Sequence, residues 1–206
     1  VIGTAGRWLI ADPGYQQYLA TNERQFTTGP TAHNCPHIAG THQTRRGAVQ
    51  VLRREQIDEH TWHTAIDMTG CYELDALQRA VRHLWLIDRR AVVLADEITC
   101  EADTPLAWHW HAHPDLAWWV EPRRVLLYHD HDARHLWLSA PQLQLDESMV
   151  HRLPGSRGQL TLIAERTVDT AQSCTWWLFQ CEPTPAAPAE VDQTRCHWLD
   201  HTFRTA

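Results

Sequence analysis

The sequence predicts an all-β protein, an antiparallel β-sandwich built from two stacked sheets. Three observations point to this fold class. Short apolar segments recur along the chain, turn residues such as Asp, Pro and Gly separate them, and helical periodicity is almost absent. The chain has 206 residues, of which 43% are hydrophobic. This length and composition suffice for the core of one large domain or two small ones.

The first predicted strand is the apolar segment 7–11, which stops at the turn signature Asp12-Pro13-Gly14. A short helix can follow near 13–19, and residues 31–39 form a second extended segment. Pro36 interrupts that segment. Because proline cannot donate to a sheet ladder, we expect this strand to lie at a sheet edge or to bulge there.

The middle of the chain predicts a hairpin. Residues 76–87 form a long apolar strand, 88–90 read as a turn, and 91–98 return. Apolar alternation predicts an earlier strand over 47–55. The later predicted strands are 106–113, 117–120, 124–129, 135–139, 142–145, 149–153, 159–165 and 175–180.

The end of the chain changes in composition. Residues 182–190 are rich in Pro and Ala and read as an extended connector, and 194–203 can form one last strand that returns to the sheet. We therefore divide the chain into a β-sandwich over 1–181 and a connector with a final strand over 182–206, both expected to belong to the same domain.

Composition excludes several classes of protein. The net charge of -7 argues against a general nucleic-acid binder. No apolar run approaches the roughly 20 residues that a membrane helix needs. The 11 Trp residues suit either a sugar-binding surface or the core of a sandwich.

The first residue is Val1, within a segment that already reads as a strand. We therefore expect the chain to be a fragment of a longer protein, and the lack of a signal peptide decides nothing. The six Cys residues form no C-x-x-C pair, so we expect free and mostly buried thiols rather than a zinc ribbon.

Two residues near the start suggest a metal site. Asp12 closes the first strand, and His33 opens the next extended segment after one loop. A carboxylate at a strand end and an imidazole at a strand start can meet in space, and together they supply two of the three protein ligands of a typical catalytic zinc site. The alternative is an Asx-turn at Asp12 and a hydrogen-bonded core histidine at His33.

This region resembles the C-terminal domain of the heparinase II/III family of polysaccharide lyases, and the resemblance extends over residues 1–180. It rests on the order and spacing of Leu9-Ile10-Ala11-Asp12-Pro13-Gly14, Arg24, Ala32-His33-Asn34, Gly40 and Gln43. The pair 82–97 is also similar to the strand–turn–Asp pattern of the family. Two positions depart from the pattern: Cys35-Pro36-His37 replaces Thr and a β-branched run, and Ala39 stands where the family commonly has Asp.

The resemblance implies a fold and an activity. Family members join an N-terminal α-helical toroid, which this chain lacks, to a C-terminal antiparallel β-sandwich, and they cleave uronate-containing polysaccharides by β-elimination. The acid and base work falls to a Tyr and to His residues. Most of these lie in the helical domain, and one catalytic His lies in a His-x-His motif just before the Asp-Pro-Gly strand. The resemblance therefore assigns no catalytic residue to this chain, and we expect it to be inactive alone.

The resemblance also implies a zinc site and a location. The second His of the His-x-His motif, Asp12 and His33 would be the ligands, so we expect the zinc site to be incomplete here. Tyr15, Tyr18 and Arg24 lie between the two candidate ligands and are the candidate contacts to an acidic polysaccharide. The missing helical domain is the expected partner, and it must supply most of the basic groove. A periplasmic or secreted location is expected.

Two other functions compete with this interpretation. A non-catalytic carbohydrate-binding or structural β-sandwich module explains the many Trp residues. An exposed row of coplanar Trp rings favours that module, and Trp side chains buried between sheets weaken it. A metal enzyme that uses His109, His111 and His113 requires these alternating residues to converge with a fourth ligand.

Overall fold

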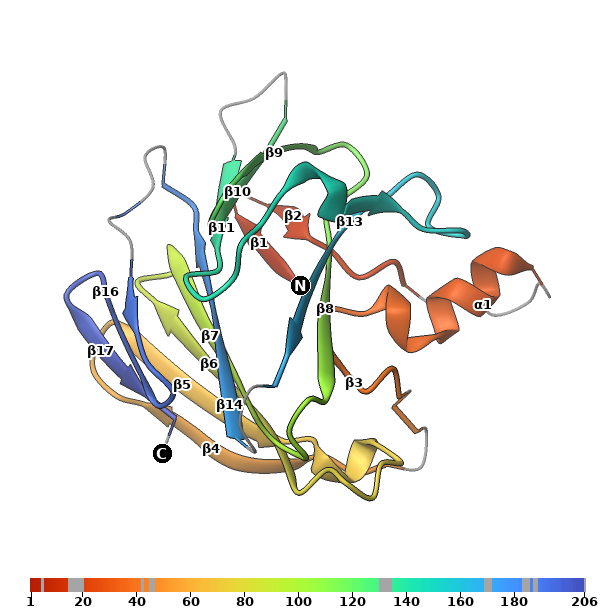
Figure 1. The fold of residues 1–206 in the computed structure, drawn as a ribbon. Coiled ribbons are helices and arrows are strands. Elements are labelled where there is room, and N and C mark those ends of the chain that lie inside the picture. The colour runs from red at the N-terminus through yellow and green to blue at the C-terminus, as the bar shows by residue number, and fades with distance from the viewer. Residues whose placement is uncertain are drawn as a thin grey trace.

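Two antiparallel sheets stack face to face in the computed structural model (Figure 1). The structure describes residues 1–4, 6–14, 21–41, 43–44, 47–129, 135–168, 172–182, 186 and 189–205. The stacking of two antiparallel sheets confirms the predicted antiparallel β-sandwich. No helix among these described residues is long and apolar enough to cross a membrane.

The larger sheet has eight strands in the order β4-β5-β6-β7-β14-β11-β10-β9. Its interior contains the predicted hairpin of β6 and β7, joined by a turn in which Asp88 and Arg89 have φ values of 49° and 57°. The strands are β4 (Gln50–Gln56), β5 (Thr61–Asp67), β6 (Arg79–Ile87), β7 (Ala91–Thr99), β9 (Ala117–Glu121), β10 (Arg124–Tyr128), β11 (His135–Ser139) and β14 (Gln172–Gln180).

The smaller sheet has four strands in the order β12-β13-β8-β3. These strands are β3 (Pro36–Ile38), β8 (Pro105–His111), β12 (Val150–Arg152) and β13 (Leu160–Thr167). Strand β3, which carries Pro36, lies at the edge of the sheet, as the missing donor of proline predicts. A two-stranded ribbon of β1 (Ile2–Thr4) and β2 (Arg7–Ile10) reaches the end of β8 through a bridge between Ile10 and Ala112.

One helix, α1 (Asn22–Thr28), lies beside the smaller sheet, and three short 3-10 helices complete the described structure, η1 (Pro30–Ala32), η2 (Thr69–Cys71) and η3 (Glu147–Met149). The helix predicted near 13–19 falls largely outside the described residues. The observed helix begins later, where the Thr21 side chain accepts from the backbone N–H of Arg24 at 3.3 Å.

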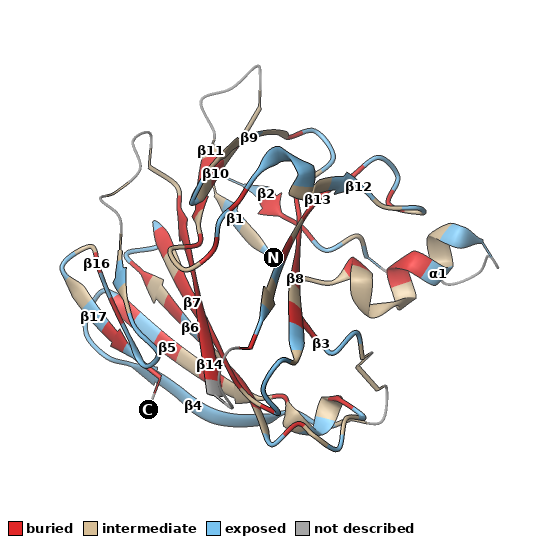
Figure 2. Ribbon diagram, in the orientation of Figure 1, coloured by how far each residue is buried: buried red, intermediate tan, exposed pale blue. Residues whose placement is uncertain are grey.

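The central strands of the larger sheet are buried on both faces (Figure 2). On β14, Trp177 and Phe179 point between the two sheets, whereas Trp176 and Leu178 point to the opposite face. The first pair belongs to the main core with the side chains of the smaller sheet. The second pair belongs to a separate apolar cluster on the outer face of the large sheet, and a further element must shield this cluster from solvent.

That cover is a small three-stranded sheet at the end of the chain, formed by β15 (Glu190–Val191), β16 (Arg195–Trp198) and β17 (His201–Arg204). Its side chains Cys196, Trp198 and Phe203 pack against the outer face of the large sheet. In Figure 1 it lies on the far side of that sheet from β8 and β13. The single last strand predicted over 194–203 is wrong, because Leu199 and Asp200 adopt left-handed φ values of 50° and 62° and turn the chain back.

Two further strand predictions differ from the structure. Strand β5 was not predicted. Its buried positions include Thr61 and His63, and these polar residues interrupt the alternation of apolar and polar residues that indicates a strand. The strand predicted over 142–145 is an irregular segment, although Leu143 and Leu145 are buried. All six Cys residues are free, and four of them are buried, as expected.

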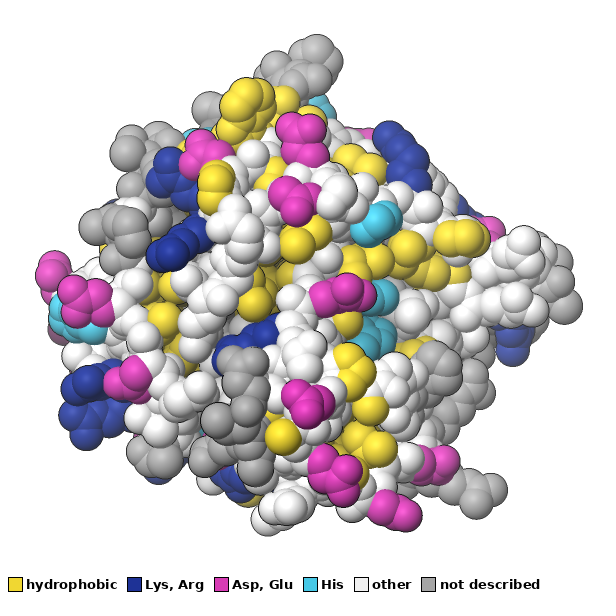
Figure 3. All heavy atoms as spheres, in the orientation of Figure 1, with side chains coloured by type: hydrophobic (Ala, Val, Ile, Leu, Met, Phe, Trp, Pro, Cys, Tyr) yellow, Lys and Arg dark blue, Asp and Glu magenta, His cyan; other side chains and the backbone are white. Residues whose placement is uncertain are grey.

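The Trp residues mainly build the core. Seven of the 11 are buried, whereas Trp8, Trp62 and Trp119 are exposed. On the face shown in Figure 3, acidic, basic and apolar side chains are interspersed. The burial of most Trp rings weakens the alternative of a module that binds sugar through a row of Trp rings.

Candidate metal centre

Asp12 is held at the end of the smaller sheet. The N–H of Ala11 donates to the carbonyl of His111 at 2.8 Å, and the N–H of His113 donates to the carbonyl of Leu9 at 3.0 Å. These bonds attach the end of β2 to the end of β8. The Asp12 Oδ1 atom then accepts from the N–H of Gly14 at 2.9 Å, which is the Asx-turn that the Asp-Pro-Gly signature predicts.

The helices α1 and η1 set the position of His33. Phe26 of α1 packs edge-on against the His111 ring, with 5.9 Å between the ring centroids. The chain then turns through η1, where the N–H of His33 donates to the carbonyl of Pro30 at 3.1 Å. His33 thus follows a short helical turn rather than opening an extended strand, and β3 begins three residues later at Pro36.

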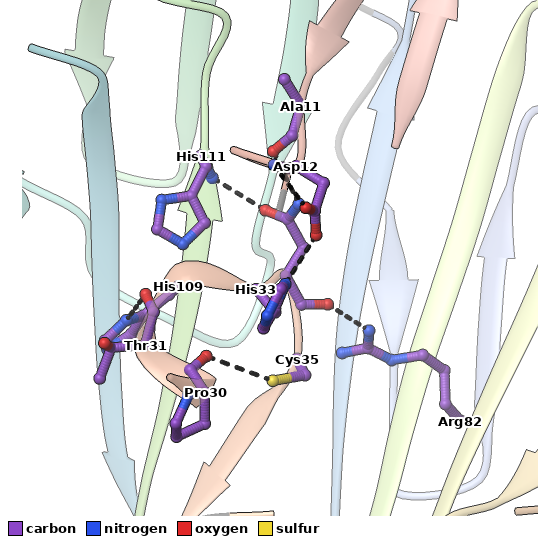
Figure 4. A network of polar contacts seen from close by, with 11 residues as sticks. Ala11, Asp12, Pro30, Thr31, His33, Cys35, Arg82, His109 and His111 are labelled. Atoms are coloured by element: carbon purple, nitrogen blue, oxygen red, sulfur yellow. Dashed lines mark hydrogen bonds and ion pairs between the residues drawn. The ribbon is translucent and has the colours of Figure 1, made fainter. Parts of the chain in front are cut away.

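The structure brings Asp12 and His33 into direct contact (Figure 4). The His33 Nδ1 atom lies 2.7 Å from Asp12 Oδ2. Burial alone would raise the pKa of Asp12, but the hydrogen bonds from His33 and from the N–H of Gly14 outweigh it, and the pKa lies below the usual value. The two side chains are 39% and 41% exposed, so this pair is open to a further ligand.

Asn34 links the two segments that carry this pair. Its Nδ2 donates to the carbonyl of Ala11 at 3.1 Å, and its Oδ1 accepts from the N–H of His111 at 2.8 Å. One amide side chain therefore fixes the residue before Asp12 and the end of β8 at once. This gives the His-Asn dipeptide a physical role, because the residue after His33 sets the position of Asp12.

A buried ion pair supports the loop from the other sheet. Arg82 donates from Nη1 to the carbonyl of Asn34 at 2.6 Å and forms two bonds of 2.7 Å and 2.8 Å with the Asp96 carboxylate. The Nε1 of Trp108 donates to the same carboxylate at 2.8 Å. Burial lowers the pKa of Arg82, but the adjacent Asp96 outweighs it and raises that pKa, so Arg82 stays charged. Sequence reasoning missed this role.

The two candidate ligands fit zinc by donor type, since carboxylate oxygen and imidazole nitrogen are both common zinc ligands. Two donors do not make a site, and the described part of the chain contains no group of three His, Cys, Asp or Glu side chains that could hold a metal ion. The nearby Cys35 thiol is buried and donates to the carbonyl of Pro30 at 3.8 Å rather than to the Asp12–His33 pair. A zinc site at this pair would need a third ligand from residues outside the described part.

With this geometry established, comparison with known proteins identifies the family. The family model described as heparinase II/III-like, C-terminal, matches residues 2–201. The chain belongs to this family. Among curated proteins, none matches the sequence.

Solved structures with the same fold include a heparan sulfate lyase and heparinase III. The heparan sulfate lyase HepC from Pedobacter heparinus matches with a TM-score of 0.73 and 11% identity over 97% of this chain. A crystal structure of heparinase III matches with a TM-score of 0.65 and 13% identity over 96% of this chain. The chain spans about a third of the length of each, 34% and 33% respectively. At these identities the likeness establishes the fold.

The histidines of β8 in this heparinase II/III-like domain do not form a metal centre of their own. His109 Nδ1 lies 3.0 Å from the carbonyl of Thr31, and His111 Nδ1 lies 2.9 Å from Thr161 Oγ1. Burial lowers the pKa of His111 to about 4, so its ring is a neutral packing element at pH 7. His113 lies beyond the strand, 3.6 Å from Asp115. The described residues thus offer no convergence of these three rings.

The predicted substrate contacts are only partly described. Tyr15 and Tyr18 lie outside the described residues. Arg24 lies on α1, the helix that joins the two candidate ligands and packs on His111 through Phe26. Its role in binding substrate stays a prediction.

Proposed function

We propose that this chain is the β-sandwich part of a polysaccharide lyase that cleaves uronate-containing polysaccharides by β-elimination, in the periplasm or outside the cell. One observation carries the proposal: Asp12 and His33 lie 2.7 Å apart at an open edge of a domain whose family model matches residues 2–201. Such a pair needs a ligand from elsewhere, which suits a centre completed by another part of a longer protein.

In the proposed centre, Asp12 and His33 bind zinc together with a histidine outside the described residues. Bound zinc supplies a fixed positive charge next to the substrate cleft. The side chains of Asn34 and Arg82 hold both ligands in place, because each bonds to the backbone of the segment that carries them. Tyr15, Tyr18 and Arg24 are the proposed contacts to the polysaccharide.

The elimination itself is assigned to residues of the helical domain. A base removes the proton at C5 of the uronate, the neutralised carboxylate stabilises the charge that develops, and the C4–O bond breaks. The carboxylate of the substrate also requires a positive groove. This chain carries a net charge of -7, and the face in Figure 3 shows charges of both signs interspersed. The helical domain is therefore the proposed source of the groove.

Zinc content of the full-length protein tests this proposal. We expect one zinc per chain by elemental analysis, and its loss in Asp12→Ala and in His33→Ala. His113→Ala is the matched control, because His113 also faces a carboxylate, that of Asp115 at 3.6 Å. Activity on uronate polymers is followed through the ultraviolet absorbance of the unsaturated product. Full-length protein with neither zinc nor unsaturated product would contradict the proposal.

A further inference from the structure

A surface hollow at one end of the large sheet contains an exposed Trp ring. The Trp62 side chain on β5 is 48% exposed. It lines a hollow of about 680 Å³, a size within the range of about 300–1,000 Å³ that is usual for small-molecule sites. The other lining residues are Gln56, Glu59, His60, Leu86, Asp88 and Arg89.

The polar rim of this hollow is fixed by bonds between two turns. The N–H of Asp88 donates to the carbonyl of His60 at 2.9 Å, and His60 Nδ1 lies 2.7 Å from Asp88 Oδ1. The N–H of His60 also donates to Asp58 Oδ1 at 2.8 Å. The β4–β5 and β6–β7 turns are thus tied together, so the polar groups of the rim are positioned before any ligand binds.

The ring is accessible because the smaller sheet does not cover this part of the large sheet. Trp62 pairs with Leu86, and on the next rung of the same face Leu84 is also exposed, at 37%. Further along β6, Arg82 contacts the loop of His33. Leu86 lies four positions along β6 from Arg82, or about 13 Å of strand. The hollow is therefore separate from the Asp12–His33 pair.

A flat aromatic ring beside fixed polar side chains is the chemistry that binds a pyranose. The apolar C–H face of the sugar covers the indole, and its hydroxyls bond to amide, carboxylate, imidazole and guanidinium groups. The acidic Glu59 and Asp88 offset Arg89, so the rim carries no net positive charge to attract a polyanion. We propose that this hollow binds a neutral pyranose unit of a glycan chain, as a binding site independent of the proposed lyase reaction.

Indole signals in an ¹⁵N nuclear magnetic resonance spectrum test this directly. The Nε1–H signal of Trp62, assigned from its absence in Trp62→Phe, should shift saturably when cellohexaose, chitohexaose or mannohexaose is added. Calorimetry should show at least a tenfold weaker affinity for Trp62→Ala. Trp119→Ala is the matched control, since Trp119 is 59% exposed but lies outside this hollow. Both variants alter exposed side chains and should keep the thermal midpoint.

Three outcomes would overturn the proposal. In the first, none of the neutral hexasaccharides shifts the Trp62 signal. In the second, Trp119→Ala weakens binding as much as Trp62→Ala does. In the third, only an acidic hexasaccharide such as oligoguluronate binds, and added salt abolishes that binding. Because the readout is the Trp62 signal itself, it is independent of zinc and of lyase activity. The two proposals can therefore fail separately.

Discussion

The Arg82 guanidinium lies 2.6 Å from the backbone carbonyl of Asn34 and so ties the centre of the large sheet to the loop of His33. The same guanidinium is locked by Asp96, directly opposite on β7. The Arg82 side chain is 13% exposed and that of Asp96 is 1% exposed, so both charges are largely removed from water. A buried ion pair of this kind fixes the positions of both side chains, because moving one partner away leaves the other as an unpaired buried charge.

Replacing Arg82 should therefore be costly. Arg82→Met leaves the Asp96 carboxylate buried without its charge partner, and we expect the free energy of unfolding to fall by about 3–5 kcal/mol. Urea denaturation measures this. Arg53→Met is the control, because Arg53 and Glu55 are 57% and 50% exposed and their ion pair should contribute no more than about 1 kcal/mol. Equal losses in the two variants would contradict the assigned role of Arg82.

Asn34 should control zinc affinity without touching the metal. Asn34→Ala removes the bonds to Ala11 and His111 that set the position of Asp12. We expect a roughly 10–100-fold weaker zinc affinity in the full-length protein, the usual effect of losing a residue that orients metal ligands. Competition with a chelator measures the affinity. Asn22→Ala, at the exposed start of α1, is the control, and an unchanged affinity in Asn34→Ala would show that the bridge is dispensable.

Acid should destabilise the fold through His63. This ring lies 3.2 Å from His83 Nδ1 and stacks on Trp85 at 4.4 Å. Burial, helped by the charge of His83 and Arg53, lowers the pKa of His63 to about 4, against an ordinary value of 6.5. The unfolded chain thus binds the proton more readily. The stability contributed by neutral His63 is complete above pH 6.5 and is lost as the pH falls from 6.5 towards about 4.

His63→Phe keeps a ring on Trp85 but cannot take up a proton. We expect the loss of stability between pH 7.5 and pH 5 to be smaller in this variant than in the unaltered protein, as measured by urea midpoints at the two pH values. His197→Ala changes an exposed histidine and should keep the original pH dependence. If His63→Phe also keeps it in full, other groups such as His111 account for the acid sensitivity.

Ala39 marks a local strain that a substitution should relieve. It follows β3 with a left-handed φ of 51°, and Gly40 follows with a φ of 65°. Left-handed backbone costs Ala roughly 1–2 kcal/mol, whereas Asn tolerates it. We expect Ala39→Asn to raise the free energy of unfolding by about 0.5–1 kcal/mol, as measured by thermal denaturation. Ala48→Asn, an exposed residue with no left-handed φ, should bring no gain.

The features that can be predicted from the sequence are those determined by residues adjacent in the chain. The turn at 88–90, the edge strand at Pro36 and the turn after Asp12 depend on local residue types, and the structure contains all three. The sequence also predicts the approach of His33 to Asp12 across one loop, although His33 follows the short helix η1 rather than opening an extended strand.

The missed parts depend on register and burial. Arg82 and Asp96 meet only because β6 and β7 pair with those residues opposite each other, which requires the exact length of the intervening turn. Strand β5 escaped detection because Thr61 and His63 occupy positions that face the apolar cluster. Polar residues at buried positions interrupt the alternation of apolar and polar residues by which a strand is predicted from the sequence.

Because the sheet of β15, β16 and β17 is made last, the aromatic residues that it covers are left exposed during synthesis. The Trp85 ring belongs to β6, which is made early, but the residues that cover it, Trp198 and Phe203, are made after every strand of the large sheet. During that interval an aromatic surface faces the solvent and is a target for chaperones and for other nascent chains. A premature stop before residue 195 would make this exposure permanent, so the last strands protect the protein from aggregation.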